Sequence, residues 1–274
     1  MASQYGESVA FSCMYAANLK KLAQLIRASG RKSVSIFAEM GILLKACDYE
    51  SVALKNKRLS DYFSRVSDGI SGRIASLNCA DLASDLEEKA EWMLWNIRKK
   101  EWLKEGFFNG YYDNRKKRVE GRIGGRIRMT LTAQAFAVMS GIAQDWQVKK
   151  IISSVDKYLF DKRLKGYRLN TDFGKEQHDL GRAFSFSYGD KENGAVFSHM
   201  VVMYAYALLS RGYKKEVEKA LDSLYRLSMD FPRSRIYPCL PEYFDLNGRG
   251  MYSYLTGSAS WFLLTCSKYN RICN

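Results

Sequence analysis

The chain has 274 residues, of which 47% are hydrophobic and 26% are charged. This composition is typical of a globular protein and excludes an intrinsically disordered chain. Lys and Arg number 43 against 29 Asp and Glu, so the net charge is +14. An excess of this size suits nucleic acid, a membrane surface or anionic small molecules as partners.

Two of these partner classes have no further support in the sequence. The densest basic cluster, Arg115 to Arg128, is broken by glycines and accompanies no nucleic-acid-binding motif, so we interpret it as a solvated loop. The longest apolar segment, Ala195 to Leu209, is too short to cross a bilayer. The six cysteines form no CxxC pair, which predicts reduced thiols, no metal site and a cytoplasmic protein. We therefore expect neither nucleic acid nor a membrane as the partner.

Helical periodicity dominates the first hundred residues. Apolar residues recur at helical spacing, and Gly30 follows the first helix as a stop signal. Ser84 and Glu87 fit a capping box at the start of a later helix. Between Tyr49 and Leu77 the pattern weakens, and we expect a helix with loops there. The helices predicted in this part are Ser8–Ala28, Val34–Asp48 and Asp81–Lys104.

Glycine-rich and polar segments separate the helices in the middle of the chain. Phe107 to Arg128 predicts a loop or a short hairpin. Helices are predicted over Thr132–Ala143 and from there to Phe160. Asp161 to Gly194 has several Gly, Asp and Asn residues and little helical period, which predicts a long functional loop region.

The last three predicted helices differ in how much of their surface is apolar. Val196–Leu209 and Tyr254–Cys266 are apolar on nearly every side, which predicts burial all round, whereas Lys214–Met229 has a single apolar stripe. Buried helices that alternate with half-exposed ones are typical of an α/α toroid, where inner helices line the axis and outer helices cover them. An ordinary helical bundle gives part of the same pattern.

Two helix starts carry the residues that could do chemistry. His199 falls in the first turn of a buried helix, where exposed N–H groups and the positive end of the helix dipole favour an anion. Glu192 lies seven residues earlier, in the preceding loop. Thr256 and Gly257 open a second apolar helix and offer a hydroxyl and a backbone N–H. We interpret the two starts as halves of a phosphate and sugar pocket; the alternative is that His199 is a packed core histidine.

The strings "KENGAVFSH" and "YLTGSASW" together resemble the inverting glycoside phosphorylases of glycoside hydrolase family 94, the cellobiose and chitobiose phosphorylase group. Supporting stretches are "GFFNGYYDN", "MTLTAQAFAVMSGIA" and "GYRLNTDFG". "IYPCLPEYF" with "GRGMYSYLTGSASW" is most similar to the branch that includes 1,2-β-oligoglucan phosphorylases. The resemblance extends over nearly the whole chain.

The resemblance implies an all-α (α/α)6 barrel in which phosphate attacks a β-glucoside and releases α-glucose 1-phosphate with inversion. Carried over by position, His199, Thr256 and the Gly257 backbone would hold phosphate, and Glu192 would bind the sugar. No cofactor is implied, because inorganic phosphate is the co-substrate. The family often has Gln near Glu242, whose role stays open.

One part of the family pattern is missing from the sequence. The general acid of the family is an Asp in a Trp-Asn-Asp segment, and no such segment occurs in this chain. We therefore expect residues 1–274 to be an incomplete barrel domain without the β-sandwich, the first barrel helices and the C-terminal extension. Such a fragment would carry no catalytic residue of its own and would be inactive alone. The alternative is a non-catalytic carbohydrate- or phosphate-binding protein, or a subunit that completes a split enzyme. A homodimer is a further alternative.

Overall fold

The computed structural model describes residues 6–44, 48–236, 239–253 and 256–273, and these residues form ten α-helices joined by short strands and turns. The all-α fold class is therefore confirmed. The chain divides into two compact units, one of Tyr15–Asn96 and one of Met1–Met14 with Ile97–Asn274. Within the described ranges, no helix has the length and apolar character that a bilayer crossing needs.

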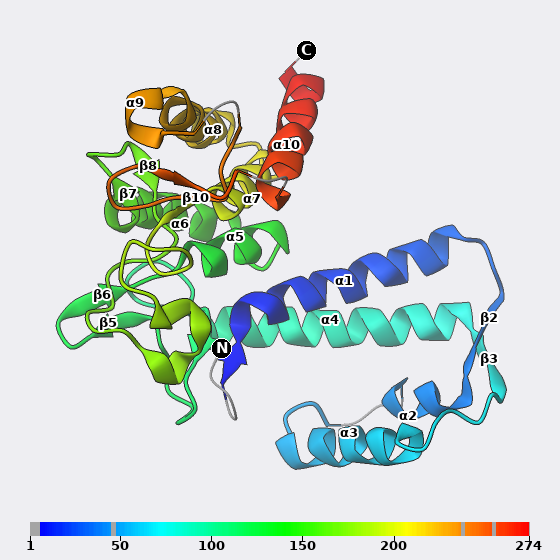
Figure 1. Cartoon of the computed structure of the whole chain (residues 1–274). Coiled ribbons are helices and arrows are strands. Elements are labelled where there is room, and N and C mark those ends of the chain that lie inside the picture. Colours follow the sequence, from blue (N-terminus) through cyan, green and yellow to red (C-terminus); the bar gives the residue numbers. More distant parts are fainter. Residues whose placement is uncertain (1–5, 45–47, 237–238, 254–255, 274) are drawn as a thin grey trace. The chain divides into compact units, whose positions relative to one another are not determined.

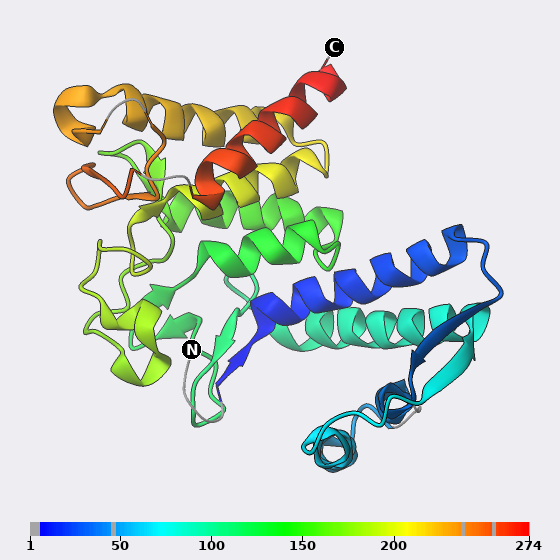
Figure 2. The same ribbon diagram turned by 45° about the vertical axis from the view of Figure 1, so that its right-hand side comes forward.

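The smaller unit is built on a pair of antiparallel helices, α1 (Val9–Ala28) and α4 (Cys79–Glu101), which run side by side in Figure 1 and Figure 2. Ala23 and Ala83 are fully buried where the two helices pack, and the small side chains let the backbones approach closely. Arg27 adds an ion pair to Glu87 at 2.7 Å. The predicted first helix is confirmed to within one residue.

The two helices are connected through a β-ribbon that the sequence did not predict. β2 (Ser33–Phe37) pairs antiparallel with β3 (Ile74–Asn78), in a register that places Val34 opposite Leu77. The helix predicted over Val34–Asp48 is therefore wrong at its start; residues 45–47 lie outside the described ranges. The reason is that the segment SVSIF alternates polar and apolar residues, a strand period, and finds a partner with the same alternation. The tip of the ribbon consists of η1 (Ala38–Met40), α2 (Gly41–Leu44) and α3 (Val52–Val66).

The start of α4 is capped differently from the prediction. Asn78 Oδ1 accepts hydrogen bonds from the backbone N–H of Ala80 at 2.8 Å and of Asp81 at 3.2 Å. Ser84 and Glu87, the predicted capping box, lie inside the helix and both accept from Arg27. The capping-box prediction was wrong because serine and glutamate three residues apart also lie on one face of a helix, where here both bind the Arg27 guanidinium.

The larger unit has the alternation expected of an α/α barrel. In α5 (Leu131–Met139) every residue from Leu131 to Val138 is buried, and α7 (Ser198–Leu209) is buried on nearly all sides. α6 (Asp145–Tyr158) and α8 (Lys214–Met229) each bury one stripe and leave the other face in solvent. α7 packs against α5, α8 and α10 (Gly257–Cys273), so the inner helices are neighbours and the half-exposed helices cover them.

α10 departs from the predicted burial. The Tyr254–Cys266 segment was expected to be enclosed on all sides, yet Leu263 is 71% exposed and Leu264 is 49% exposed; Tyr254 and Leu255 lie outside the described residues. Ser258 and Thr265 mark the enclosed face, which packs on α7. The four cysteines whose side chains are described, Cys13, Cys79, Cys239 and Cys266, are free thiols.

Short strands hold the loops between the helices, as the glycine-rich segments predicted. The loop after α4 contains a hairpin, and the long loop before α7 contains a second hairpin and two turns of 3-10 helix. The strands are β1 (Glu7–Ser8), β4 (Tyr111–Tyr112), β5 (Gly121–Ile123), β6 (Arg126–Arg128), β7 (Phe160–Asp161), β8 (Gly166–Tyr167), β9 (Val196–Phe197), β10 (Tyr243–Phe244) and β11 (Gly250–Met251). The turns are η2 (His178–Leu180) and η3 (Arg182–Ser185), and α9 (Phe231–Ser234) follows α8.

Candidate functional site

The N-terminal ends of α7 and α10 lie against each other. His199 is the second residue of α7 and Gly257 is the first residue of α10. A Cβ atom added to Gly257 would lie 2.5 Å from Cε1 and 2.9 Å from Nε2 of the His199 imidazole, closer than packed atoms come. The structure thus brings these two predicted site residues into direct contact, and only glycine fits at position 257 without displacing the imidazole.

His199 has an unused nitrogen at this meeting point. Its Nε2 atom is buried and has no hydrogen-bond partner among the described residues. Burial lowers the pKa of the imidazole, and the nearby Glu242 carboxylate opposes this in part. Because buried polar atoms in folded proteins are almost always paired, an unpaired ring nitrogen at a helix N-terminus is suited to a ligand with hydrogen-bonding oxygens.

Thr256 starts α10. Its Oγ1 atom accepts a hydrogen bond from the backbone N–H of Ser258 at 3.1 Å, which satisfies one of the unpaired donors of the helix terminus. A threonine hydroxyl can donate while it accepts, so the proton of this group stays available for a ligand. The hydroxyl oxygens of Ser198 and Ser258, in the first turns of α7 and α10, are also buried without a partner in the described part of the chain.

Glu192 lies in the loop before β9 and is held by a cation that the sequence did not single out. Arg182 Nη2 donates to Glu192 Oε1 at 2.9 Å, whereas Glu192 Oε2 is buried and lacks a partner within the described ranges. One carboxylate oxygen is therefore fixed by a protein contact and the other can accept from a ligand. Arg182 sits ten residues earlier in an irregular loop, so no periodicity in the sequence connects the two residues.

The loop that carries Glu192 is held by asparagine side chains. Asn170 Nδ2 donates to Asn193 Oδ1 at 3.0 Å, and Asn170 Oδ1 accepts from the Gly194 N–H at 2.8 Å. Gly194 has φ of +82°, and a Cβ atom there would lie 2.1 Å from the ring of Tyr188. The Tyr188 ring therefore occupies the space that a side chain at position 194 would need. The glycine is needed for packing and backbone conformation.

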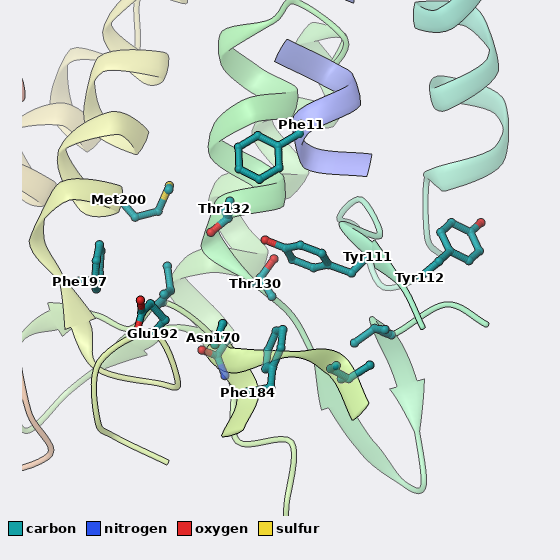
Figure 3. A pocket seen from close by; sticks show the side chains of 14 residues that line it. Phe11, Tyr111, Tyr112, Thr130, Thr132, Asn170, Phe184, Glu192, Phe197 and Met200 are labelled. Carbon is teal, nitrogen blue, oxygen red and sulfur yellow. The ribbon is translucent and has the colours of Figure 1, made fainter. Parts of the chain in front are cut away.

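An apolar cavity of about 260 Å³ lies on one side of Glu192. Figure 3 shows that side chains from α1, α5, α7 and the loops between them converge on it. Its walls are mostly aromatic and aliphatic, with a few hydroxyl and amide groups between them. Among the lining residues are Phe11, Tyr111, Thr130, Thr132, Phe184 and Met200.

A polar cavity of about 240 Å³ lies on the other side of Glu192. Arg182 and Lys191 give it positive charge, Glu242 gives it negative charge, and Tyr243 and Tyr252 supply ring faces. Glu192 and Phe197 line both cavities and so form the wall between them.

Three of the four predicted site residues lie beside these cavities. Within the described residues, His199, Thr256 and Gly257 belong to neither lining. Glu242 connects them to the polar cavity, because its carboxylate acts on His199 and its backbone C=O accepts from the Ser198 N–H at 2.9 Å. The candidate site thus consists of the contact between His199 and Gly257 next to a polar cavity, with an apolar cavity beyond Glu192.

Comparison with known proteins identifies the class to which this arrangement belongs. The sequence profile described as glycosyl hydrolase 94 superfamily, catalytic domain, matches residues 73–270, which is more than half of the chain. The chain therefore belongs to the catalytic-domain family of glycosyl hydrolase 94.

Two curated relatives are similar at a lower level. An N,N'-diacetylchitobiose phosphorylase of Vibrio proteolyticus is 25% identical over 198 residues, which is 69% of this chain and 24% of the relative. A cellobionic acid phosphorylase of Neurospora crassa is 25% identical over 210 residues, which is 66% of this chain and 24% of the relative. This chain thus matches about a quarter of the length of either relative.

Proposed function

We propose that this chain forms the phosphate- and sugar-binding part of an inverting glycoside phosphorylase that acts on β-glucosides in carbohydrate metabolism. The observation that carries the proposal is the contact between His199 and Gly257, with the buried unpaired Nε2 atom beside it. The family membership and the two phosphorylase relatives support the same reaction class.

Phosphorolysis requires a binding site for the phosphate anion and does not require a general base. A phosphate oxygen forms a bond to the anomeric carbon while the bond from that carbon to the leaving sugar oxygen breaks. The leaving oxygen takes a proton from a general acid that a partner must supply, since the Trp-Asn-Asp segment is absent from this sequence, and the product is α-glucose 1-phosphate. Phosphate is already a charged nucleophile, so no general base is required, in contrast to inverting hydrolysis.

Each predicted residue has a defined part in this proposal. The His199 imidazole, the Thr256 hydroxyl and the Gly257 N–H donate to phosphate oxygens, and the positive ends of α7 and α10 favour the anion. Glu192, fixed by Arg182 through Oε1, accepts from a sugar hydroxyl through Oε2. The net charge of +14 raises the local concentration of phosphate around the protein.

Phosphate binding to a histidine variant tests the proposal. We expect His199→Ala to weaken inorganic phosphate binding by roughly 10- to 100-fold, since a hydrogen bond to a charged group contributes about 1.5–3 kcal/mol. Isothermal titration calorimetry measures the affinity, and far-UV circular dichroism should show unchanged helicity. His178→Ala is the matched control, because His178 is exposed and is the only other histidine in the sequence.

Equal phosphate affinity in wild type and His199→Ala would mean that His199 only packs against α10, and the proposal would fail. The reaction itself is followed by release of glucose 1-phosphate from sophoro-oligosaccharides or cellobiose with excess phosphate. We expect no such release from the chain alone, because its sequence contains no Trp-Asn-Asp segment, and ready turnover would contradict this expectation. Co-purification with a partner that carries the missing aspartate would favour a subunit that completes a split enzyme.

A further inference from the structure

The polar groups in the wall of the apolar cavity are already used within the protein. Thr130 Oγ1 donates to Glu120 Oε1 at 2.8 Å and accepts from the Ala133 N–H at 3.4 Å. The hydroxyl groups of Tyr111 and Thr132 are hydrogen-bonded to each other. A ligand in this cavity therefore meets side chains whose hydrogen-bonding capacity is mostly taken.

The same holds for Tyr112 and Asn170, whereas Glu192 Oε2, in the wall shared with the polar cavity, has no partner among the described residues. Tyr112 Oη donates to Glu101 Oε1 at 2.9 Å, and both ends of the Asn170 amide are bonded to the Glu192 loop. A pyranose ring carries several hydroxyl groups, each of which loses hydrogen bonds to water when it is buried without a partner. Away from Glu192, the wall is thus a poor match for a sugar and a good match for an apolar ring.

The shape and size of the cavity suit such a ring. Phe11, Phe184 and Met200 contribute apolar surface from α1, η3 and α7, as the close-up view in Figure 3 shows. Phe184 is held in place by stacking on Phe173, with ring centroids 5.0 Å apart. An apolar cavity of roughly 150 Å³ is enough for benzene, so about 260 Å³ accommodates a substituted six-membered aromatic ring.

Glu192 and Phe197 connect this cavity to the proposed sugar site, because both residues line the two cavities. We propose that the apolar cavity binds the aglycone of an aryl β-glucoside, whose glucose ring lies on the other side of Glu192. This inference rests on the proposed function and adds a substrate class to it. Phe197 lies between the aglycone and the glucose ring of such a substrate, and Glu192 accepts a hydrogen bond from a hydroxyl group of the glucose.

Two probes that differ only in the aglycone test the inference. Calorimetric titrations with phenyl β-glucoside and methyl β-glucoside are done on the full chain with saturating inorganic phosphate. We expect phenyl β-glucoside to bind at least about tenfold more tightly, because only its ring buries apolar area in the cavity. Equal affinities would overturn the inference and leave the proposed function intact.

Variants that fill the apolar cavity test whether the phenyl ring of the glucoside binds there. Ala183→Phe, from η3, and Met200→Trp, from α7, should each remove the preference for phenyl β-glucoside while phosphate affinity stays at the wild-type level. Unchanged phosphate affinity also shows that the variant is folded, and if one variant misfolds the other gives the answer. A preference that survives in a folded variant would place the ring elsewhere and overturn the inference. If neither phosphate nor either glucoside binds to the wild-type chain, the proposed function itself fails.

Discussion

Replacing Gly257 with alanine tests the contact on which the anion site depends. The added Cβ atom would lie 2.5 Å from His199 Cε1, whereas ordinary van der Waals contact begins at 3.4 Å. The imidazole must therefore move by at least 3.0 − 2.5 = 0.5 Å, and by 3.4 − 2.5 = 0.9 Å to reach ordinary contact. Gly257 does not have a positive φ, so the substitution acts through this contact and not through backbone strain.

A displacement of this size is large for a hydrogen bond. An N–H···O bond of about 2.9 Å that lengthens by a similar amount falls outside the range in which such bonds form. Loss of one bond to a charged group costs about 1.5–3 kcal/mol, so we expect phosphate affinity to fall by roughly 10- to 100-fold. The free energy of unfolding should fall by about 0–2 kcal/mol, because the better helix propensity of alanine, about 1 kcal/mol, offsets only part of an overpacking cost of about 1–3 kcal/mol.

The assay combines phosphate calorimetry with urea unfolding. Gly41→Ala is the matched control, since Gly41 also opens a helix and has no atom within 4 Å of its added Cβ. We expect wild-type phosphate affinity in Gly41→Ala and weakened binding in Gly257→Ala. Wild-type affinity in Gly257→Ala, with the protein folded, would refute the view that this contact positions His199 for phosphate.

Three further predictions concern other parts of the larger unit. Burial raises the pKa of Glu120 from 4.5 to about 8, so the folded state keeps a proton that the unfolded chain releases. The free energy of unfolding should then fall by up to about 1.4 kcal/mol per unit as pH rises from 4.5 towards 8, and a Glu120→Gln variant with the same slope would contradict this. Leu208→Ala should cost about 2–5 kcal/mol in urea unfolding, against under about 0.5 kcal/mol for the exposed Leu263→Ala. Arg182→Ala should weaken glucoside binding and leave phosphate affinity unchanged, because Arg182 orients Glu192; a parallel loss of both would show a general effect of charge.

Helices with a continuous apolar stripe could be read from the sequence. Lys214–Met229 is predicted and observed with the same bounds, because Val217, Ala220 and Leu224 recur at the helical period and all are buried. The exposure of α10 could not be predicted in this way, since the exposed Leu263 is as apolar as the half-buried Trp261 and Phe262. Its environment depends on which helices pack around it, and apolar character does not specify those neighbours.

Contacts between segments that are far apart along the chain were the features that the sequence did not predict. The ribbon of Ser33–Phe37 and Ile74–Asn78 joins two short strands that are more than thirty-five residues apart, and neither contains a turn signal that points to the other. The pairing becomes visible only when both strands are placed together. For the same reason, the bond from Arg182 to Glu192 and the apolar cavity beside it had no signal in the sequence.

The sequence alone determined most of the helices, the positions of the two helix starts and the residue types present there, because these follow from local periodicity and from short motifs. The tertiary structure decided that His199 meets Gly257, that Tyr188 fills the space beside Gly194, and that the polar wall of the apolar cavity is internally bonded. These are properties of side chains that come together from separate elements. Their distances are set by packing, and no spacing along the chain encodes them.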